Sequence, residues 1–471
     1  MRPALLALVL VGCGGDEAAT VPDARPADDA SVVTGPTGVV SGSRLRARYF
    51  ADANGQRAFI GWRDTQLGLD CSWDQSAEPS CLPEATGVQA YADAACTQPL
   101  LTRYAFQCDA RPTHVLDYDT CGTTRSIYLV GAQVTPAMVY VHNGGACEAS
   151  VPTATYFSTT PDPSAATYAR GMIVDRGTTR VRTRLVVGAD GSQQPLEAYD
   201  TTLATTCFPF FTAAPNDANN YCLPRSMPSS FSDASDCSTP VAFAPAACPI
   251  PDYIDVPNTP FLVYRRGAQW VDGPTATTPM YRRSRPTDTT VACSAVSRPT
   301  SPLESAFHAG EQIPASFLPP VTRVIEPSTT SRLSAAYFAI GDYRKFDLLH
   351  DVPGGFDCAA TRTSETEWRC LPPFGAVSRR YFDDAACTTS VPSINFYGPD
   401  RRYATEIIGN SCGAAPTSVK AYSVGAVLAP SSLYHFENGT CVPGVVEGDD
   451  IYALGSELPL DAFVAMTPIV E

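Results

Sequence analysis

The 471-residue sequence lacks the patterns that mark a zinc site or a membrane-spanning helix. Its five histidines do not stand at ligand spacings, and its 17 cysteines include no Cys-x-x-Cys pair, so we expect no bound metal. No hydrophobic run reaches the ~20 residues that a transmembrane helix needs. We also expect no cofactor, and the composition that remains is typical of a secreted, soluble globular protein.

Positive charge is scarce as well. The chain has 33 Lys and Arg residues against 48 Asp and Glu residues, which gives a formal net charge of −15. The field of such a chain repels a phosphate backbone, and the sequence contains no nucleic-acid-binding motif. We therefore expect no nucleic-acid partner.

The first residues have the order of an export signal. Arg2 precedes an apolar run from Ala4 to Gly12 that is too short to span a membrane. The run ends in Leu10-Val11-Gly12-Cys13, which resembles the lipobox of bacterial lipoproteins. That resemblance implies that cleavage before Cys13 leaves a lipidated cysteine as the membrane anchor, and Gly14 behind it favours the outer membrane. The alternative is an ordinary signal peptide that contains a cysteine.

A disordered tether is predicted at residues 13–42, behind the signal peptide of residues 1–12. The tether segment contains no aromatic residue and no hydrophobic period, so it cannot bury enough surface to fold. Its five acids against one arginine keep it extended and solvated. Such a segment holds the folded part of the chain away from a membrane surface.

The rest of the chain is one unit repeated three times, at residues 43–177, 178–328 and 329–471. In each copy an aspartate stands seven residues before a cysteine, and a Cys-Leu-Pro triplet, an Asp-Ala element with a cysteine, and a Tyr-x-x-Gly-Ala motif follow in the same order. The aspartates are Asp64, Asp200 and Asp351; the triplets begin at Cys81, Cys222 and Cys370; the Asp-Ala elements end at Cys96, Cys237 and Cys387; the tyrosines are Tyr128, Tyr264 and Tyr422. Collinear landmarks of this kind indicate a repeat architecture.

Strand patterns dominate each copy. Short alternating or β-branched runs such as 45–50, 126–130 and 137–142 are separated by turn residues, and Asn54-Gly55, Asp190-Gly191 and Asn143-Gly144 are typical of hairpin turns. We therefore predict an all-β protein. About eight strands per copy would make two four-stranded blades, which favours a six-bladed β-propeller. The alternative is three tandem β-sandwich or barrel modules.

The sixteen cysteines after Cys13 suit disulfides formed in an oxidising compartment. The first two of each copy are close enough to staple a hairpin, which predicts the pairs Cys71–Cys81, Cys207–Cys222 and Cys358–Cys370. Sequence spacing then pairs Cys96 with Cys108 or Cys121, Cys237 with Cys248, and Cys387 with Cys412. This leaves Cys293 and Cys441 to bridge between copies or to follow a different pairing.

With these landmarks the mature chain resembles the cysteine-rich repeat lipoproteins predicted in large-genome Gram-negative bacteria. The resemblance rests on the lipobox, the Cys-Leu-Pro triplets and the Asp-Ala-Ala-Cys elements. The middle copy departs from it at residues 233–237, where the element is Asp-Ala-Ser-Asp-Cys. The resemblance implies a location in the cell envelope and carries over no activity.

Two patterns point to catalysis or metal binding, and each has a simpler interpretation. Gly409-Asn410-Ser411-Cys412-Gly413 matches the nucleophile motif of hydrolases, with His435 downstream, but it lacks the strand, turn and helix that the motif requires. The repeated aspartates Asp64, Asp200 and Asp351 would suit calcium if they met on one axis. We favour instead that each accepts backbone N–H bonds in its own turn. We therefore assign no catalytic residue.

Side chains that break the repeat are the better guide to function. In the middle copy two strands carry Arg265, Arg266, Arg282, Arg283 and Arg285, where the other copies have nearly uncharged runs. If these strands face each other across a hairpin, their guanidinium groups form a site for an anionic ligand such as lipopolysaccharide phosphate or an acidic glycan. The alternative is a solvated face that pairs with neighbouring acids.

These features favour a non-catalytic binding module that is anchored to the membrane and recognises an envelope or extracellular partner. The alternative is a secreted propeller-type hydrolase or lyase acting on polysaccharide, which needs two carboxylates, or a histidine and a carboxylate, in one cleft. The tryptophans Trp62, Trp73, Trp270 and Trp368 would serve either function as a glycan-stacking platform. We expect them to fill the β core instead.

Overall fold

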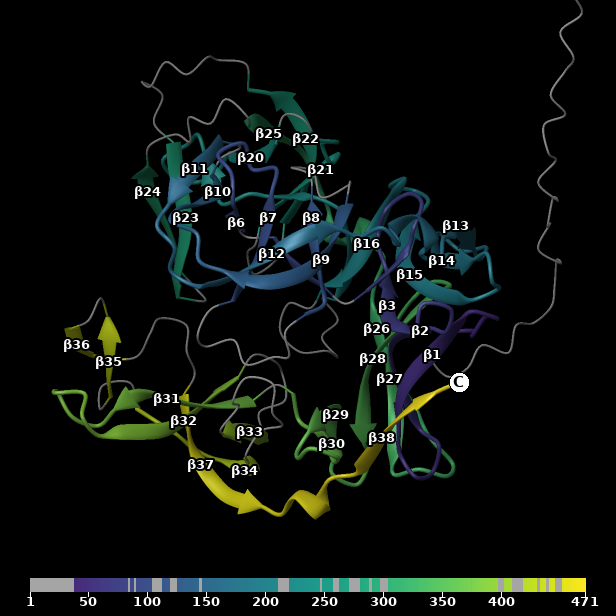
Figure 1. The fold of residues 1–471 in the computed structure, drawn as a ribbon. Helices are drawn as coiled ribbons and strands as arrows, with labels where there is room; N and C mark the ends of the chain where they lie inside the picture. Colours follow the sequence, from purple (N-terminus) through teal and green to yellow (C-terminus); the bar gives the residue numbers. More distant parts are fainter. Residues whose placement is uncertain are drawn as a thin grey trace, which may run out of the picture. The chain divides into compact units, whose positions relative to one another are not determined.

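The computed structural model describes residues 38–471, except 84, 89, 104–111, 119–124, 144–145, 211–219, 246–247, 257–261, 271–279, 288–289, 297–303, 374, 397–401, 409–417, 430–432, 438–439 and 445–450. Residues 35–471 form one compact unit. Its described part consists of β-strands, turns and one-turn 3-10 helices at Ala165–Thr167, Ala315–Phe317 and Leu460–Ala462 (Figure 1). The all-β prediction is confirmed. Within the described ranges, no helix has the length and apolar character needed to cross a membrane.

Three groups of five neighbouring strands recur along the chain, and we call them sheets A1, A2 and A3; A3 and A1 are continuous as one ten-stranded sheet, whereas A2 is a sheet of its own. Sheet A1 contains, in spatial order, β38 (Ala465–Val470), β1 (Leu45–Ala51), β2 (Arg57–Asp64), β3 (Leu69–Trp73) and β4 (Cys81–Pro83). Sheet A2 contains β13 (Gly171–Arg176), β14 (Val181–Gly188), β15 (Gln193–Asp200), β16 (Thr205–Phe210) and β17 (Tyr221–Pro224). Sheet A3 contains β26 (Thr322–Glu326), β27 (Leu333–Ile340), β28 (Tyr343–Asp351), β29 (Phe356–Arg362) and β30 (Trp368–Leu371).

A second sheet follows in each repeat, and we call these sheets B1, B2 and B3. Sheet B1 contains β5 (Ala85–Gly87), β6 (Ala90–Tyr91), β7 (Pro99–Arg103), β8 (His114–Tyr118), β9 (Arg125–Val134), β10 (Val139–Asn143), β11 (Ala146–Ser150) and β12 (Thr155–Pro161). Sheet B2 contains β18 (Met227–Pro228), β19 (Phe231–Ser232), β20 (Pro240–Pro245), β21 (Tyr253–Val256), β22 (Leu262–Gln269), β23 (Met280–Thr287), β24 (Thr290–Val296) and β25 (Glu304–Ile313). Sheet B3 contains β31 (Gly375–Phe382), β32 (Ser390–Phe396), β33 (Tyr403–Ile408), β34 (Ser418–Val427), β35 (Tyr434–Glu437), β36 (Thr440–Pro443) and β37 (Ile451–Leu458).

Local sequence explains the hairpins of the A sheets. In β1, Leu45 and Ala47 are buried while Arg46 between them is exposed, which is the alternation of a strand with one face in the core. The turns between β1 and β2 and between β14 and β15 hold Gly55 and Gly191, at φ angles of 87° and 88°. Because glycine adopts this left-handed conformation without strain, the hairpin turns predicted at Asn54-Gly55 and Asp190-Gly191 are confirmed.

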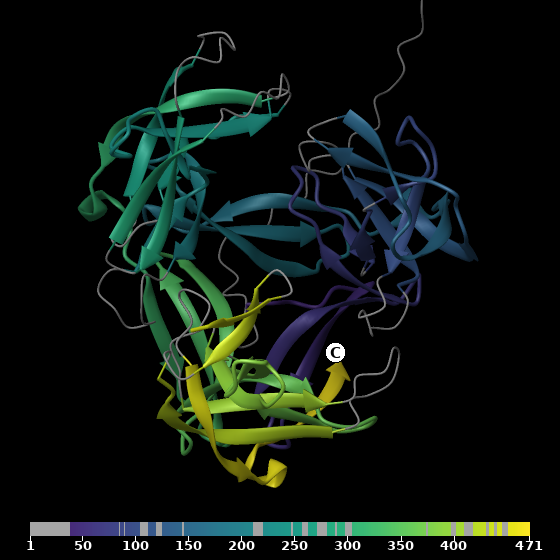
Figure 2. The same ribbon diagram turned by 90° about the vertical axis from the view of Figure 1, so that its left-hand side faces the viewer.

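Backbone hydrogen bonds join the three A sheets in a cycle. The edge of each A sheet donates an N–H bond to the segment just before the first strand of the next one. The bonds are Cys81 N–H to Ala169 O (2.8 Å), Cys222 N–H to Pro319 O (2.8 Å) and Cys370 N–H to Val464 O (2.9 Å). The strand β38 then pairs with β1, so the C-terminal strand completes the first sheet (yellow beside purple in Figures 1 and 2).

The hairpin turns of the A sheets form a second set of joints. In each turn an aspartate accepts a hydrogen bond from the chain that leads into the opening strand of another A sheet. Asp190 accepts from Leu45 N–H (2.6 Å), Asp342 accepts from Thr179 N–H (2.7 Å), and Asp52 accepts from the hydroxyl of Ser331. The sheets A2 and A1, A3 and A2, and A1 and A3 are thus joined through the same turn of each repeat.

The B sheets share one strand order and curl on themselves. In B3, β31 pairs with β32 on one side and with β33 on the other, so β31, β32, β37, β34 and β33 close into a barrel. In B1 the equivalent of β31 is divided into β5 and β6, and β5 pairs in parallel with β8. In B2 the same position is divided into β18 and β19.

Each repeat is therefore not divided into the two four-stranded blades that the strand count favours. Among the described strands, each repeat has a five-stranded A sheet and a B sheet of seven or eight strands, and A3 and A1 join through β30 and β38 into one ten-stranded sheet. The six four-stranded blades of a propeller are not found among these strands. The B sheets are barrel-like modules, whereas the A sheets connect the three repeats to one another. Strand counting misses this because β13, β26 and β38 end one repeat but pair with the opening strand of another.

Disulfides staple both sheets of every repeat. The A sheets contain Cys71–Cys81, Cys207–Cys222 and Cys358–Cys370, the three pairs that the spacing predicts. The B sheets contain Cys96–Cys147, Cys237–Cys293 and Cys387–Cys441. In the Cys-Leu-Pro triplet the two side chains serve different sheets: Cys222 packs in the core of A2, and Leu223 packs against Tyr253 and Val263 of B2.

The pairing predicted for the other cysteines is wrong. Cys96 bonds to Cys147 instead of Cys108 or Cys121. Cys237 bonds to Cys293 instead of Cys248, and Cys387 bonds to Cys441 instead of Cys412. Proximity in sequence misleads here because β19 pairs with β23 and β31 pairs with β35, which brings the Asp-Ala turn beside a hairpin formed much later in the chain. Cys248 is itself disulfide-bonded, and Cys108, Cys121 and Cys412 lie outside the described residues.

Candidate functional site

The repeated aspartates have a structural role. Asp64, Asp200 and Asp351 are at most 1% exposed. Each pairs with the arginine that opens its own A sheet, in the ion pairs Arg44–Asp64 (2.6 Å), Arg180–Asp200 (2.8 Å) and Arg332–Asp351 (2.7 Å). Each also accepts a backbone N–H bond in its own turn, from Gln66, Thr202 and Gly354 respectively. The structural interpretation is confirmed, and each carboxylate is committed to its own turn instead of a shared calcium site.

The arginine-rich strands β22 and β23 do not form the expected hairpin. In sheet B2 they are separated by β25, β20 and β19, so the predicted meeting of their guanidinium groups across a hairpin is wrong. Arg266 pairs with Asp252 at 3.0 Å and lies 5.5 Å from the centre of the Phe307 ring. Arg265 and Arg282 are exposed, while the side chains of Arg283 and Arg285 lie outside the described part. Anion binding by these arginines stays a prediction.

Three other candidates from the sequence do not form a site that the structure describes. Cys13 and the Gly409–Gly413 motif with Ser411 lie outside the described residues. The tryptophans are not gathered on one platform: Trp62 and Trp73 fill the core of A1, and Trp368 packs against the core of A3. Half-buried Trp270 lies beside His308 in B2, with 5.2 Å between the ring centres.

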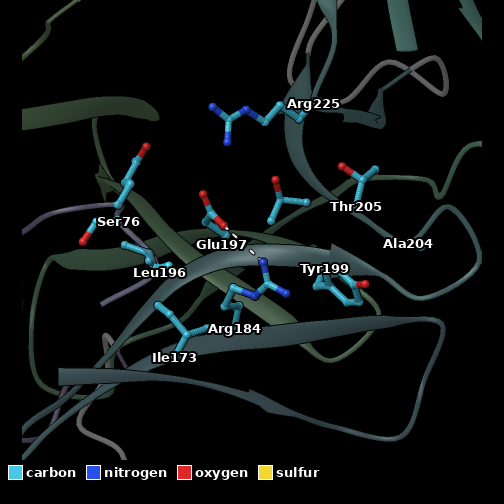
Figure 3. A pocket seen from close by; sticks show the side chains of 12 residues that line it. Ser76, Ile173, Arg184, Leu196, Glu197, Tyr199, Ala204, Thr205 and Arg225 are labelled. Atoms are coloured by element: carbon cyan, nitrogen blue, oxygen red, sulfur yellow. Dashed lines mark ion pairs between the residues drawn. The ribbon is translucent and has the colours of Figure 1, made fainter. Parts of the chain in front are cut away.

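A groove lies over sheet A2, along strands β15 and β16. It consists of two adjoining cavities of about 300 and about 290 Å³, and we call it the A2 groove. The two cavities share Gln75, Leu196, Glu197, Thr206 and Arg225 in their walls. Figure 3 shows the larger of the two, with Leu196, Glu197 and Arg225 labelled. Residues of all three repeats line the groove, because Gln75 follows β3 of A1 while Tyr343 and Lys345 lie on β28 of A3.

Arg184 is a fixed positive charge at one end of the A2 groove. It stands opposite Glu197 in the register of β14 and β15, with 3.9 Å between Arg184 Nη1 and Glu197 Oε2. Asp175 of β13 accepts a 2.9 Å bond from Arg184 Nε, and the guanidinium lies 4.3 Å from the centre of the Tyr199 ring (Figure 3). A carboxylate on one side and an aromatic face on another leave this side chain little freedom.

Glu197 is a carboxylate with a perturbed pKa in the middle of the A2 groove. Its side chain is 26% exposed. Burial raises the pKa of Glu197, and the positive charges of Arg184 and Arg225 oppose this rise only in part. Burial and the charge of Glu197 also raise the pKa of Tyr343, so this phenol stays neutral at ordinary pH. Glu197 therefore takes up a proton at a higher pH than an ordinary glutamate.

Two further cations, Arg225 and Lys345, line the groove. Arg225 follows β17, where its backbone N–H donates to Thr206 O over 2.9 Å, and Figure 3 shows its side chain extending over the groove near Glu197. Lys345 is exposed on β28 and lines the other cavity together with Phe208, which is 47% exposed. Within the part of the chain that the structure describes, neither Arg225 nor Lys345 has an acidic side chain within 4.0 Å.

Three charged residues of the A2 groove do not recur in the other repeats, whereas Arg184 has a counterpart in Arg48, which also stands four residues after the opening arginine. Glu197 stands three residues before the repeated aspartate, Arg225 follows Cys-Leu-Pro, and Lys345 stands six residues before the repeated aspartate. The other copies have Gly61 and Leu348 in place of Glu197, Glu84 and Pro373 in place of Arg225, and Ala58 and Gln194 in place of Lys345. A comparison of the copies at these fixed offsets would have marked the three positions as variable, but not as neighbours.

The repeat architecture agrees with the comparison with known families. The model of a family of unknown function, DUF7481, matches residues 15–249 and again residues 153–463. The chain belongs to DUF7481. The two matched regions overlap, which is consistent with a repeated unit. No curated protein matches this DUF7481 chain, and no solved structure does.

Polar and charged side chains make up much of the lining of the A2 groove in this DUF7481 protein. Among the described residues in its walls, Glu197 is the one carboxylate, none is a histidine, and Cys207 is held in a disulfide. Glycoside hydrolysis usually needs two carboxyl groups that flank the bond. The described ranges also contain no cluster of three or more His, Cys, Asp or Glu residues that would hold a metal ion. The groove offers hydrogen bonds and charge to a ligand without assembling an acid–base pair.

Proposed function

We propose that this DUF7481 chain is an exported, lipid-anchored binding protein of the bacterial cell envelope, and that the A2 groove is its ligand site. The export step is supported by the six described disulfides, which point to an oxidising, extracytoplasmic compartment. It is also supported by the Leu10–Cys13 sequence, which resembles a lipobox, and by the tether-like composition that follows. Acylation of Cys13 would anchor the chain at the outer membrane.

One observation carries the binding function. Residues from three repeats, far apart in the chain, line a single groove, and the charged residues Glu197, Arg225 and Lys345 differ from their counterparts in the other copies. The surrounding A sheets are fixed by the disulfides and by the turn aspartates, so the groove keeps its form before a ligand arrives. A preorganised site loses little conformational entropy on binding. Side chains that vary while their scaffold repeats are expected where a ligand is recognised.

The hydrolase or lyase alternative has less support. The A2 groove holds Glu197 without a second carboxylate or a histidine among its described lining residues. A second place for an anionic partner is offered by the exposed Arg265 and Arg282 in B2, on separate strands. Loss of lipopolysaccharide or acidic glycan binding in an Arg265→Ala, Arg282→Ala variant, with the A2 groove intact, would place the ligand there instead.

The test of the proposed function uses the full chain with Cys13→Ser, so that it is exported without a lipid and stays in solution. It is applied to an array of envelope glycans and lipopolysaccharides. Gln75→Trp fills the groove from an exposed turn position, and Glu78→Trp is the matched control, since Glu78 is exposed in the same turn but does not line the groove. We expect binding that Gln75→Trp abolishes and Glu78→Trp leaves unchanged. Binding unaffected by Gln75→Trp, or no binding to any component, would contradict the proposal.

Anchoring is tested separately in a Gram-negative host supplied with labelled palmitate. The wild-type chain is expected to take up the label and to fractionate with the outer membrane. The Cys13→Ser variant is expected to lose both the label and the membrane association. Label that persists in Cys13→Ser would show that this cysteine is not the acylated residue.

A further inference from the structure

Two exposed cations on an acidic protein point to the ligand of the A2 groove. The chain carries a net charge of −15, so acidic side chains are available to pair with any exposed base. Most bases of the A sheets are paired in this way, as Arg184 is with Asp175. Arg225 and Lys345 line one cavity without such a pair among the described residues. A negatively charged ligand would form an ion pair with both cations.

The walls of the groove favour a hydroxyl-rich ligand over an apolar one. Ligand sites for apolar molecules are deep and lined mainly by hydrophobic side chains. Here Gln75, Glu197 and Thr206 present an amide, a carboxylate and a hydroxyl along the groove. These groups match the many donors and acceptors of a saccharide. The exposed ring of Phe208 adds a flat apolar face for the carbon-bound hydrogens of a sugar ring.

The two cations differ in how they recognise an anion. The planar guanidinium of Arg225 matches the two oxygens of a carboxylate or phosphate, whereas the ammonium of Lys345 acts as a compact point charge. Glu197 lies between the two ends of the groove and accepts hydrogen bonds from hydroxyl groups when it is ionised. A neutral sugar unit at Glu197 and an anionic substituent at Arg225 and Lys345 would therefore satisfy both kinds of group.

Building on the proposed function, we infer that the A2 groove binds an anionic saccharide whose acidic substituent is held by Arg225 and Lys345. The full chain with Cys13→Ser is titrated calorimetrically with short oligomers of galacturonate, mannuronate and hyaluronan, with a neutral dextran oligomer, and with inorganic phosphate. Arg225→Ala and Lys345→Ala remove one cation each. Arg344→Ala is the matched control, because Arg344 lies next to Lys345 on β28 but pairs with Glu326 and lies over Tyr337, outside the groove.

The expected result is binding of at least one acidic oligomer that weakens with added salt and that loses about tenfold or more in affinity with each groove variant. Arg344→Ala is expected to bind as the wild type does. Equal binding of the neutral dextran oligomer, unaffected by Arg225→Ala and Lys345→Ala, would overturn the inference and leave the groove as a site for neutral glycans. Phosphate binding as tight as that of the oligomers would overturn the saccharide part. No binding to any acidic oligomer would overturn the inference even where the array finds another ligand.

Discussion

The carboxylate of Asp190 accepts a 2.6 Å hydrogen bond from the backbone N–H of Leu45, across 145 residues of sequence. Asp190 lies in the turn between β14 and β15, and Leu45 begins β1 in another sheet. The same carboxylate also accepts a bond from Arg44 N–H at 3.1 Å. This aspartate therefore accepts hydrogen bonds from two backbone N–H groups at the start of β1, and joins sheet A2 to sheet A1.

Removal of the Asp190 carboxylate is expected to destabilise the whole body of A sheets. Asp190→Ala leaves the N–H groups of Arg44 and Leu45 without their acceptor, at a cost of about 2 kcal/mol in the free energy of unfolding. Urea denaturation followed by tryptophan fluorescence would measure this, because Trp62 and Trp73 lie in the core of A1. Asp461→Ala, which removes an acid from a 3-10 helix away from these joints, is the control and should change the midpoint little.

The same joint predicts a loss of stability in acid. Burial alone would raise the pKa of Asp190, but the hydrogen bonds from Leu45, Ser192 and Arg44 outweigh it and lower the pKa below its ordinary value. A lowered pKa in the folded state adds stability that is present above the unfolded pKa and is lost as the pH falls through the folded one. We expect the unfolding midpoint of the wild type to drop as the pH falls below about 4, the ordinary pKa of an aspartate, and that of Asp190→Asn to drop less. If the unfolding midpoints of the two proteins fell in parallel with pH, the titration of Asp190 would not be the cause of the acid instability.

A disulfide map of the exported protein is expected to show long-range pairs in the B sheets. The bridges Cys96–Cys147, Cys237–Cys293 and Cys387–Cys441 close loops of 51, 56 and 54 residues. Loops of this size predict a stabilisation of about 4 kcal/mol for each bond. Peptide mapping by mass spectrometry without reduction should recover Cys387 linked to Cys441, and a peptide that links Cys237 to Cys248 would contradict the structure.

Sequence reasoning succeeds in this protein where the cause is local. Asp64 could be assigned to its own turn because its backbone donors lie two and three residues further along the chain. The turn at Asp190-Gly191 follows in the same way from the conformational freedom of one glycine. The short disulfide Cys71–Cys81 closes a single hairpin, between neighbouring strands.

Contacts that depend on the order of strands in a sheet could not be predicted from the sequence. Cys293 finds its partner only because β19 lies beside β23, and no spacing in the sequence encodes that neighbour. The strands of Arg265 and Arg282 look like a hairpin, yet three other strands lie between them. The A2 groove is the extreme case, since Glu197 and Lys345 come from different repeats and meet only through the cycle of A sheets. A repeat pattern shows which residues vary and leaves open which of them face each other.

Glu197 is expected to make ligand binding pH-dependent. When ionised it repels an anionic ligand held by Arg225 and Lys345, and as the pH falls through its raised pKa it takes up a proton and the repulsion disappears. The groups that face it are Arg184 from β14, which Asp175 pairs, and Tyr343 from β28, which stays neutral because its own pKa is raised.

Affinity for an acidic oligomer should therefore rise as the pH is lowered from about 8 to about 5, a range in which the uronate itself stays ionised. Glu197→Gln keeps the size and the acceptor oxygen but removes the charge, so it should bind more tightly at pH 8 and show a flat pH profile. Calorimetric titrations of both proteins across this range would measure the difference. A wild-type affinity that falls on acidification, or an equal slope in Glu197→Gln, would show that Glu197 does not face the bound anion.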